Sequence, residues 1–182
     1  MDKQNFLILL TGRPACGKTT MVENIVKEWK DRVKLAGFLT REIREKGQRT
    51  GFELVGLDGQ KQILSHINLK TPYRVGKYSV DVNGFEEFLS LLLLTRPENE
   101  LIIIDEIGKM ECLSEKFRNL ILELMDKGFP LLATIALSGT PFIERIKARP
   151  EAEIIRLTRE GWHLAKDKLN LRLETYFLNK LT

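Results

Sequence analysis

The sequence predicts a three-layer α/β fold, in which helices cover both faces of a mainly parallel β-sheet. Short runs that are almost wholly apolar, such as residues 6–10 and 101–104, are typical of strands buried on both faces. Segments with apolar residues at helical spacing alternate with these runs along most of the chain. Because the strands of successive βα units lie parallel in one sheet, this alternation predicts a parallel sheet between two helical layers.

The first βα unit is the clearest. A strand over residues 6–10 leads through a loop that contains Gly and Pro into a helix over residues 18–30. We expect the core face of that helix to carry Met21, Ile25, Val26 and Trp29, which recur at helical spacing. A second strand is expected over residues 36–40.

Residues 41–80 are richer in Gly and in polar residues, and their short runs alternate between apolar and polar. Asp58-Gly59 separates two such runs, which is a strong signal for a β-hairpin. We therefore expect this segment to form an antiparallel hairpin insertion beside the parallel sheet. The whole chain, residues 1–182, is expected to be a single domain that contains this insertion.

The alternation of helices and strands resumes after residue 80. Helices are expected over residues 83–94, 114–127 and 141–148, with Asn83 and Ser114 as the N-caps of the first two. Strands are expected over residues 101–104, 130–136 and 153–157. A last helix is expected to run to about residue 181.

Composition excludes several classes of protein. Hydrophobic residues make up 43% and charged residues 30% of the 182, which is ordinary for a globular domain. No signal peptide and no apolar stretch long enough to span a membrane is present, so we expect a cytoplasmic protein without membrane contact. The two cysteines form no CxxC pair, which argues against a zinc site or a disulfide scaffold. The net charge of +4 comes from interspersed charges, so a site for polyphosphates explains it as well as nucleic acid does; nucleic acid stays an alternative partner, and we expect a monomer.

Residues 12–19 match the pattern G-x-x-x-x-G-K-[ST] in full, between an expected strand and an expected helix. The glycines let successive backbone N–H groups point at phosphate oxygens, and the helix adds its positive N-terminal dipole. Lys18 is expected to reach the β- and γ-phosphates, Thr19 to ligate Mg²⁺, and Thr20 to contact the α-phosphate. Cys16 within the loop is interpreted as a small space-filling residue, with oxidation that obstructs the site as the alternative.

A second motif follows the apolar strand at residues 101–104, which delivers Asp105-Glu106 to the carboxyl edge of the sheet. Asp105 is expected to hold Mg²⁺ through water, and Glu106 to orient and deprotonate an attacking water. The alternative is a strand that ends in two solvated acids. Residues 105–108 also fit the D-x-x-G loop of switch GTPases, but the sequence lacks a usable N-K-x-D motif, which argues against a guanine-specific switch.

Other side chains have weaker signals. Thr134, polar in an apolar strand, is expected either to sense the γ-phosphate or to bond to backbone. An arginine on the γ-phosphate can supply a large part of the rate, and we rank Arg44 first among the candidates, which are Arg41, Arg44, Arg49 and Arg145. Trp162 is interpreted as either core or part of a base pocket. The two histidines, His66 and His163, are expected to be structural or exposed.

Three stretches together indicate a family: residues 17–20, residues 37–44 with 49–52, and residues 104–111. The chain resembles the small P-loop nucleoside triphosphatases first described from thermophiles, whose animal members are called cancer-related nucleoside triphosphatases. The resemblance implies a RecA-like core and slow, Mg²⁺-dependent hydrolysis of several nucleoside triphosphates to diphosphate and phosphate. Two departures are Ala15, where family members usually have Gly, and Gly161-Trp162, where they tend to have Asn-Arg.

The sequence thus predicts a Mg²⁺-dependent nucleoside triphosphatase that accepts ATP, GTP, CTP and UTP, with Glu106 as base, Lys18 as electrostatic stabiliser and Arg44 as the first candidate arginine. Nucleotide contacts are expected from Gly12, Arg13, Pro14, Ala15, Cys16, Gly17, Lys18, Thr19, Thr20, Ile104, Asp105, Glu106 and Gly108. The alternatives are a nucleotide or nucleoside kinase, which needs a second pocket and a lid, and an NTP-gated, RNA-associated binding module.

Overall fold

The computed structural model describes residues 6–178 of the chain. Its strands are β1 (Leu7–Gly12), β2 (Leu35–Glu45), β3 (Gln48–Gly56), β4 (Lys61–His66), β5 (Arg74–Val75), β6 (Tyr78–Val80), β7 (Leu101–Ile107), β8 (Leu131–Ile135) and β9 (Glu153–Leu157). Its helices are α1 (Lys18–Trp29), α2 (Val82–Leu92), the 3₁₀ turn η1 (Glu111–Leu113), α3 (Glu115–Asp126), α4 (Pro141–Lys147) and α5 (Trp162–Leu178). Across residues 6–178 the strands form one sheet in the order β5-β6-β4-β3-β2-β7-β8-β1-β9.

The half of the sheet from β2 to β9 is parallel, as the sequence predicted. β7 pairs with β2 on one side and with β8 on the other, while β1 lies between β8 and β9. The runs at residues 7–10 and 101–104 are buried throughout, which explains why they are apolar at every position. Because β8 separates β1 from β7, the loop after β1 and the acids at the end of β7 face each other across one strand.

The other half of the sheet is antiparallel; it matches the predicted insertion in extent but contains more strands than one hairpin. β2 pairs in parallel with β7 over Leu35–Phe38 and then continues to Glu45, antiparallel to β3. Strands β3, β4, β6 and β5 extend this arrangement, with Asp58-Gly59 in the turn between β3 and β4 as predicted. The expectation that the second strand ends at residue 40 was wrong, because residues 41–45 pair with β3 although they are polar and largely exposed.

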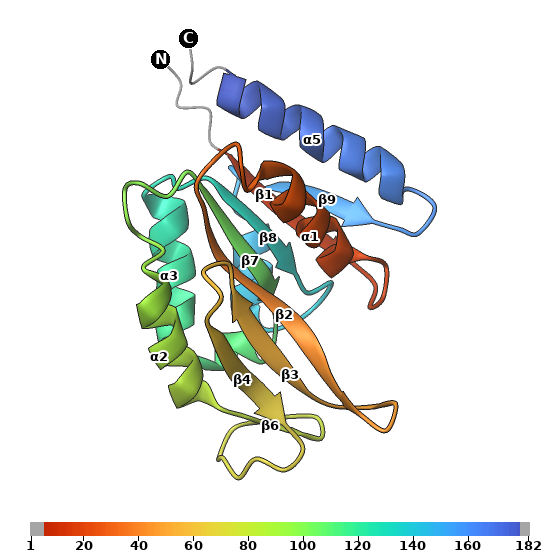
Figure 1. Cartoon of the computed structure of the whole chain (residues 1–182), viewed down its shortest axis with the longest axis vertical. Helices are drawn as coiled ribbons and strands as arrows, with labels where there is room; N and C mark the ends of the chain where they lie inside the picture. The colour runs from red at the N-terminus through yellow and green to blue at the C-terminus, as the bar shows by residue number, and fades with distance from the viewer. Residues whose placement is uncertain (1–5, 179–182) are drawn as a thin grey trace.

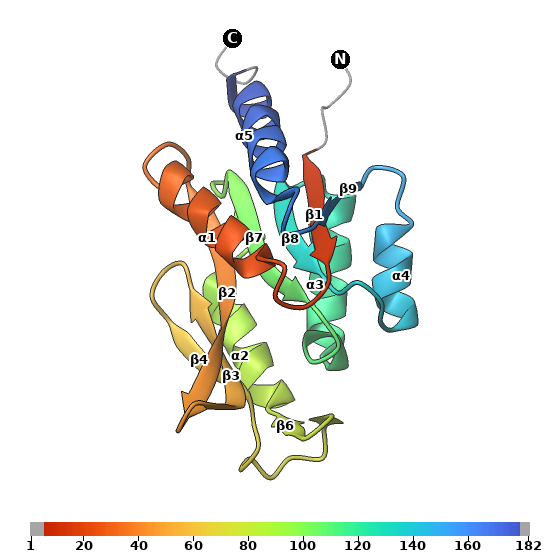
Figure 2. The same ribbon diagram turned by 90° about the vertical axis from the view of Figure 1, so that its right-hand side faces the viewer.

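The helices form two layers, one on each face of the parallel half, as Figure 1 and Figure 2 show. Alternate side chains of β1 point to opposite layers: Ile8 and Leu10 pack in the cluster with α1 and α5, and Leu7 and Leu9 in the cluster with α2, α3 and α4. Phe38 of β2 anchors the second cluster through edge and tilted contacts to aromatic rings of α2 and α3. The three-layer α/β fold is therefore confirmed.

The N-caps of α2 and α3 illustrate what local sequence can and cannot decide. Ser114 caps α3 as predicted, because its hydroxyl accepts from the backbone N–H of Phe117 at 2.9 Å. Asn83 was predicted to cap α2, but the cap is Asp81, whose carboxylate accepts from the Gly84 N–H at 3.0 Å. Asp and Asn are equally good caps, and the end of β6 at Val80 selects the earlier one. The end of α5 predicted near residue 181 lies outside the described residues.

None of the helices within residues 6–178 combines the length and the apolar character needed to cross a membrane.

Gly37 marks the closest approach of β2 to β7. Its φ is +129°, and a Cβ there would lie 1.8 Å from the carbonyl oxygen of Ile103. We predict that Gly37→Ala lowers the free energy of unfolding by more than about 2 kcal/mol, because a buried strand pair would have to separate. Gly59→Ala is the matched control: its φ is +91°, but nothing lies within 4 Å, so backbone strain alone costs about 1 kcal/mol. Urea unfolding measures the free energy of unfolding of both variants. Equal losses would contradict the claim that close packing against Ile103 requires Gly37.

Candidate active site

The loop between β1 and α1 is shaped to bind an anion. Helix α1 begins at Lys18, with Gly17 as a left-handed N-cap at φ +94°. No side chain caps the first turn, and no acidic residue lies in it. The N–H groups at the start of α1 are therefore left for a ligand, and the helix dipole favours a negatively charged one.

Trp162, the first residue of α5, packs against Gly17 of this loop. Its indole Nε1 donates to the carbonyl oxygen of Gly17 at 3.1 Å, and a Cβ on Gly17 would lie 2.8 Å from the same nitrogen. Gly17 is thus required both by its left-handed backbone and by the packing of the indole. The indole N–H is thus engaged by the loop, and Trp162 does not line the cavity described below.

Ala15 has a left-handed backbone, with φ +59°. This conformation explains why the resembled family usually has Gly at that position, since a side chain there costs about 1 kcal/mol. Ala15 is exposed at the tip of the loop and touches the cavity, so the departure changes backbone strain without filling the site.

Lys18 lies back over the loop, where its Nζ donates to the carbonyl oxygen of Gly12 at 3.4 Å. Burial raises the pKa of both acids of β7, and the charge of Lys18 opposes that rise. The ammonium group is therefore held between the loop and the acidic strand end, where the β- and γ-phosphates of a bound nucleotide are expected.

Asp105 is the most constrained side chain of the site, with only 1% of it exposed. One carboxylate oxygen accepts from the hydroxyl of Thr19 at 2.8 Å, and the other from the hydroxyl of Thr134 at 2.5 Å. The hydroxyl of Thr40 donates to its main-chain oxygen. Burial raises the pKa of Asp105, and the Thr134 and Thr19 hydroxyls oppose this rise. The sequence had suggested that Thr134 either senses the γ-phosphate or bonds to backbone. In the structure its hydroxyl bonds instead to the carboxylate of Asp105.

The oxygen atoms of this cluster fit Mg²⁺. The hydroxyl proton of Thr19 points to Asp105, which leaves the lone pairs of the hydroxyl oxygen to face a cation, and hard cations prefer oxygen ligands. Among residues 6–178 no three His, Cys, Asp or Glu side chains gather around a possible metal position. Mg²⁺ usually takes few protein ligands and completes its shell with phosphate and water, so Thr19, with Asp105 acting through water, suffices.

Glu106 follows Asp105 and reaches into the cavity. Burial raises its pKa, the charge of Lys18 opposes this rise, and the charge of Asp105 adds to it. A carboxylate with a raised pKa is a stronger base than an exposed one, which suits proton abstraction from water.

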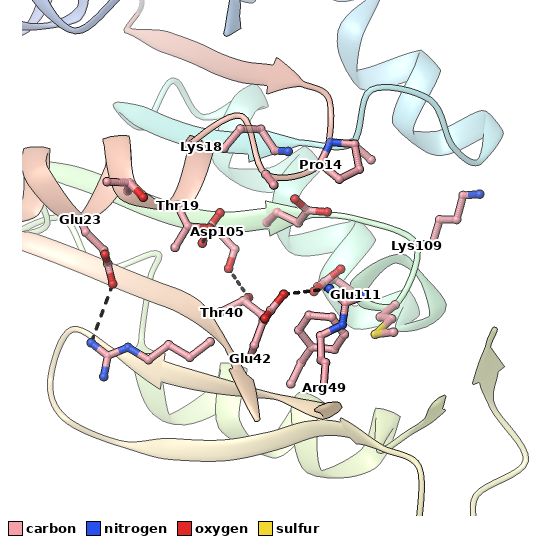
Figure 3. Close-up of a pocket in the computed structure, with 18 of the residues that line it drawn as sticks. Pro14, Lys18, Thr19, Glu23, Thr40, Glu42, Arg49, Asp105, Lys109 and Glu111 are labelled. Atoms are coloured by element: carbon pink, nitrogen blue, oxygen red, sulfur yellow. Dashed lines mark hydrogen bonds and ion pairs between the residues drawn. The ribbon is translucent and has the colours of Figure 1, made fainter. Parts of the chain in front are cut away.

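One cavity of about 770 Å³ joins these groups to the antiparallel half of the sheet. Figure 3 shows Lys18, Thr19 and Asp105 on one side of it, and Glu42 and Arg49 on the other. Of the residues predicted from sequence, it is lined by Pro14, Ala15, Gly17, Lys18, Thr19, Thr20, Asp105 and Glu106. The predicted contacts that do not line it are Gly12, Arg13, Cys16, Ile104, Gly108 and Arg44.

The structure reorders the candidate arginines. Arg44 lies near the tip of the β2–β3 hairpin, where it pairs with Glu42 and donates to the carbonyl oxygen of Gly47. Arg49, by contrast, lines the cavity. Its guanidinium is held by Glu42 at 2.8 Å and by the Tyr78 hydroxyl at 3.0 Å. The sequence could not separate these arginines, because the pairing of β2 with β3 decides which one faces the cavity.

The remaining candidates divide in the same way. Arg41 lines the cavity and lies 4.0 Å from Glu23, whereas Arg145 on α4 does not line it. His66 lies 3.2 Å from a carboxylate oxygen of Glu45, and His163 is exposed.

Sequence reasoning gave no role to several residues that line the cavity, namely Glu23, Thr40, Glu42, Phe52, Val75, Lys109, Met110, Glu111 and Ala136. A signal existed for some of them, because Thr40, Glu42 and residues 109–111 lie in the stretches that carry the family resemblance. No motif assigns them a role, and only the folded sheet brings β2 and η1 to the same cavity.

A family model described as NTPase matches residues 7–170. The chain belongs to this NTPase family. That match spans the phosphate loop, the Asp105-Glu106 pair and every strand of the sheet.

Individual relatives agree with the family assignment. The chain is 44% identical over 156 residues to the nucleoside-triphosphatase THEP1 of Thermotoga sp. (strain RQ2), covering 85% of this chain and 87% of that protein. It is 36% identical over 177 residues to the human cancer-related nucleoside-triphosphatase, covering 88% and 93%. The resemblance seen in the sequence is therefore confirmed.

Two solved structures share the fold. The crystal structure of THEP1 from Aquifex aeolicus matches with a TM-score of 0.80 and 36% identity, over 89% of this chain and 95% of that one. The solution structure of the human cancer-related nucleoside triphosphatase matches with a TM-score of 0.77 and 33% identity, over 91% and 96%. The antiparallel half of the sheet thus lies within an architecture shared with these NTPases.

The hydroxyl of Thr134 provides a test of the Asp105 cluster. We predict that Thr134→Val lowers the apparent affinity for Mg²⁺ by about 10- to 100-fold, because the hydroxyl that orients the Asp105 carboxylate is lost. Thr11→Val is the matched control, since the buried hydroxyl of Thr11 has no hydrogen-bond partner in the described part of the chain. Nucleotide binding titrated against Mg²⁺ measures the effect. Equal affinities for the two variants would contradict the role of Thr134.

Proposed function

We propose that this chain is a Mg²⁺-dependent nucleoside triphosphatase that transfers the γ-phosphoryl group to water, with little preference for the base. The observation that carries the proposal is the convergence of Lys18, Thr19, Asp105 and Glu106 on a single cavity. These residues come from two elements that are far apart in sequence, and β8 holds those elements at a fixed separation.

The roles follow from the contacts. The loop N–H groups and Lys18 bind the β- and γ-phosphates, while Thr19 directly and Asp105 through water would hold Mg²⁺. Bound Mg²⁺ would neutralise charge on the phosphate oxygens. Glu106 orients a water molecule and accepts its proton as the water oxygen bonds to the γ-phosphorus. The bond from that phosphorus to the bridging oxygen breaks, leaving diphosphate and phosphate.

Weak base preference follows from what the site lacks and from what Trp162 does. The sequence contains no usable N-K-x-D motif to read guanine. The indole of Trp162, which the sequence left as either core or part of a base pocket, donates its N–H to the carbonyl oxygen of Gly17 and so offers a base no hydrogen bond from that group. We therefore propose that ATP, GTP, CTP and UTP all serve as substrates, and that a monomer suffices because one chain supplies every group named above.

Steady-state phosphate release from the four common nucleoside triphosphates tests the function. We predict kcat/KM values for the four nucleotides within about a hundredfold of one another. Release in the absence of any added acceptor distinguishes hydrolysis from a kinase reaction.

Lys18→Ala tests the phosphate loop. We predict that this variant loses most turnover, because no other loop side chain places a cation on the β- and γ-oxygens. Unchanged turnover in Lys18→Ala would show that the loop is not the active site.

The Asp105-Glu106 pair separates metal binding from proton transfer. We predict that Glu106→Gln lowers kcat by about 10²- to 10⁴-fold and leaves nucleotide affinity nearly intact, because Gln keeps the shape but cannot take a proton. Asp105→Asn should weaken Mg²⁺-dependent binding as well as rate. Turnover and ATP affinity are measured with and without Mg²⁺ for both variants. Full hydrolysis by Glu106→Gln would mean that another group orients the water.

A further inference from the structure

Glu111 is a buried acid to which the mechanism above gives no role. It is the first residue of η1, which follows the carboxyl end of β7. Only 4% of Glu111 is exposed, although it lines the cavity. Within residues 6–178 it forms no ion pair, unlike Glu23 and Glu42, which also line the cavity. An ionised carboxylate is rarely buried without a cation, because burial removes its hydration.

Glu111 and Glu106 lie against the same glycine. A Cβ on Gly108 would lie 2.7 Å from the carboxyl oxygen Oε2 of Glu111 and 2.8 Å from Oε1 of Glu106. The α-carbon of Gly108 is therefore in contact with both carboxyl groups, and any side chain there would displace them. This explains why a position predicted to contact the nucleotide is buried and outside the cavity lining.

The charges around Glu111 do not neutralise it. On β7, Glu106 and Asp105 are both acidic, and Lys18 of α1 acts on those two. On the helices, Arg118 of α3 donates to the main-chain oxygen of Cys112, and Glu86 of α2 accepts from the hydroxyl of Ser114. Across the cavity, Arg49 and Glu42 pair with each other. Lys109, the cation closest to Glu111 in sequence, lines the cavity but is exposed, and it forms no ion pair with Glu111. Arg118 and Arg49 are bonded elsewhere, and Lys18 acts on the two acids of β7.

Burial, and after it the charge of Glu106, raises the pKa of Glu111 to about 8. The backbone N–H groups of Glu111 itself and of Gly108 oppose this rise. At neutral pH Glu111 is therefore mostly a neutral carboxylic acid, and the side chain adds no charge beside Glu106.

We propose that Glu111 is a positioning residue for Glu106: as a buried neutral acid it fixes the turn at Gly108, so that the one negative charge at this position stays on the carboxylate that faces the cavity. The proposal rests on the proposed role of Glu106 as base. Ionisation of Glu111 would place two like charges on either side of one glycine, and the turn would have to open to hydrate them.

The consequence is that ionisation of Glu111 should limit turnover at alkaline pH. We expect kcat of the wild type to fall as pH rises through about 8, and Glu111→Gln, the neutral isostere, to lack this decline. At pH 7, Glu111→Ala should lower kcat by about 10- to 100-fold with little change in KM, because the base is misplaced while phosphate binding is intact. Glu111→Gln should recover most of that loss.

The experiment measures kcat and KM from about pH 6 to 10 for the wild type, both Glu111 variants and Glu115→Gln, an exposed-carboxylate control on α3. A full kcat in Glu111→Ala would overturn the proposal. So would a Glu111→Gln variant that is as slow as Glu111→Ala, or one that keeps the alkaline decline, because the neutral form would then not be the active one.

A second measurement, of stability, does not depend on turnover. It therefore tests the protonation of Glu111 even if the proposed function is wrong. Between the ordinary carboxyl pKa of 4.5 and about 8, the folded protein holds a proton on Glu111 that the unfolded chain releases. The contribution of Glu111 to stability therefore falls with rising pH across this window, so the slope of stability against pH is more negative in the wild type than in Glu111→Gln. Urea midpoints over the same pH range show this difference; identical slopes would mean that Glu111 is not a buried neutral acid.

Discussion

The buried carboxylate of Asp105 is the interaction on which the site depends. Its two oxygens accept from hydroxyls of α1 and β8, and its main-chain oxygen accepts from a hydroxyl of β2. A charge with 1% exposure is tolerated only if such partners are in place. The acid therefore links the start of α1 to three neighbouring strands, and the helix that follows the phosphate loop is held to β7 by the same set of bonds.

The sheet order turns this cluster into a working cavity. With β8 between β1 and β7, the phosphate loop and the acids lie at the same carboxyl edge with a strand's width between them. The continuation of β2 past β7 then adds an opposite wall, which carries Arg49 and Glu42. The antiparallel half thus lines the cavity together with the parallel half, and it brings charged side chains to the far side.

Features coded over a few neighbouring residues were predictable. The phosphate loop, the apolar strands, the Asp58-Gly59 turn and the Ser114 cap each depend on local backbone geometry, and the structure has all four. Features decided by pairing were not. The polar second half of β2 forms a strand because β3 satisfies its backbone groups, and Asp81 caps α2 because β6 ends immediately before it. Hydrophobic periodicity contains neither fact, since both depend on partners elsewhere in the chain.

The site divides along the same line. The sequence by itself determined the chemistry that is available: a lysine and a threonine at the start of a helix, and an Asp-Glu pair at the end of a buried strand. Only the tertiary structure decided which side chains join them. It turned Thr134 onto Asp105, brought Arg49 and not Arg44 to the cavity, set Trp162 beneath the loop, and placed Glu111 beside Glu106 across Gly108. The reason is physical: a motif fixes the backbone of a few residues, whereas the neighbours that set burial and charge come from strands and turns far away in the chain.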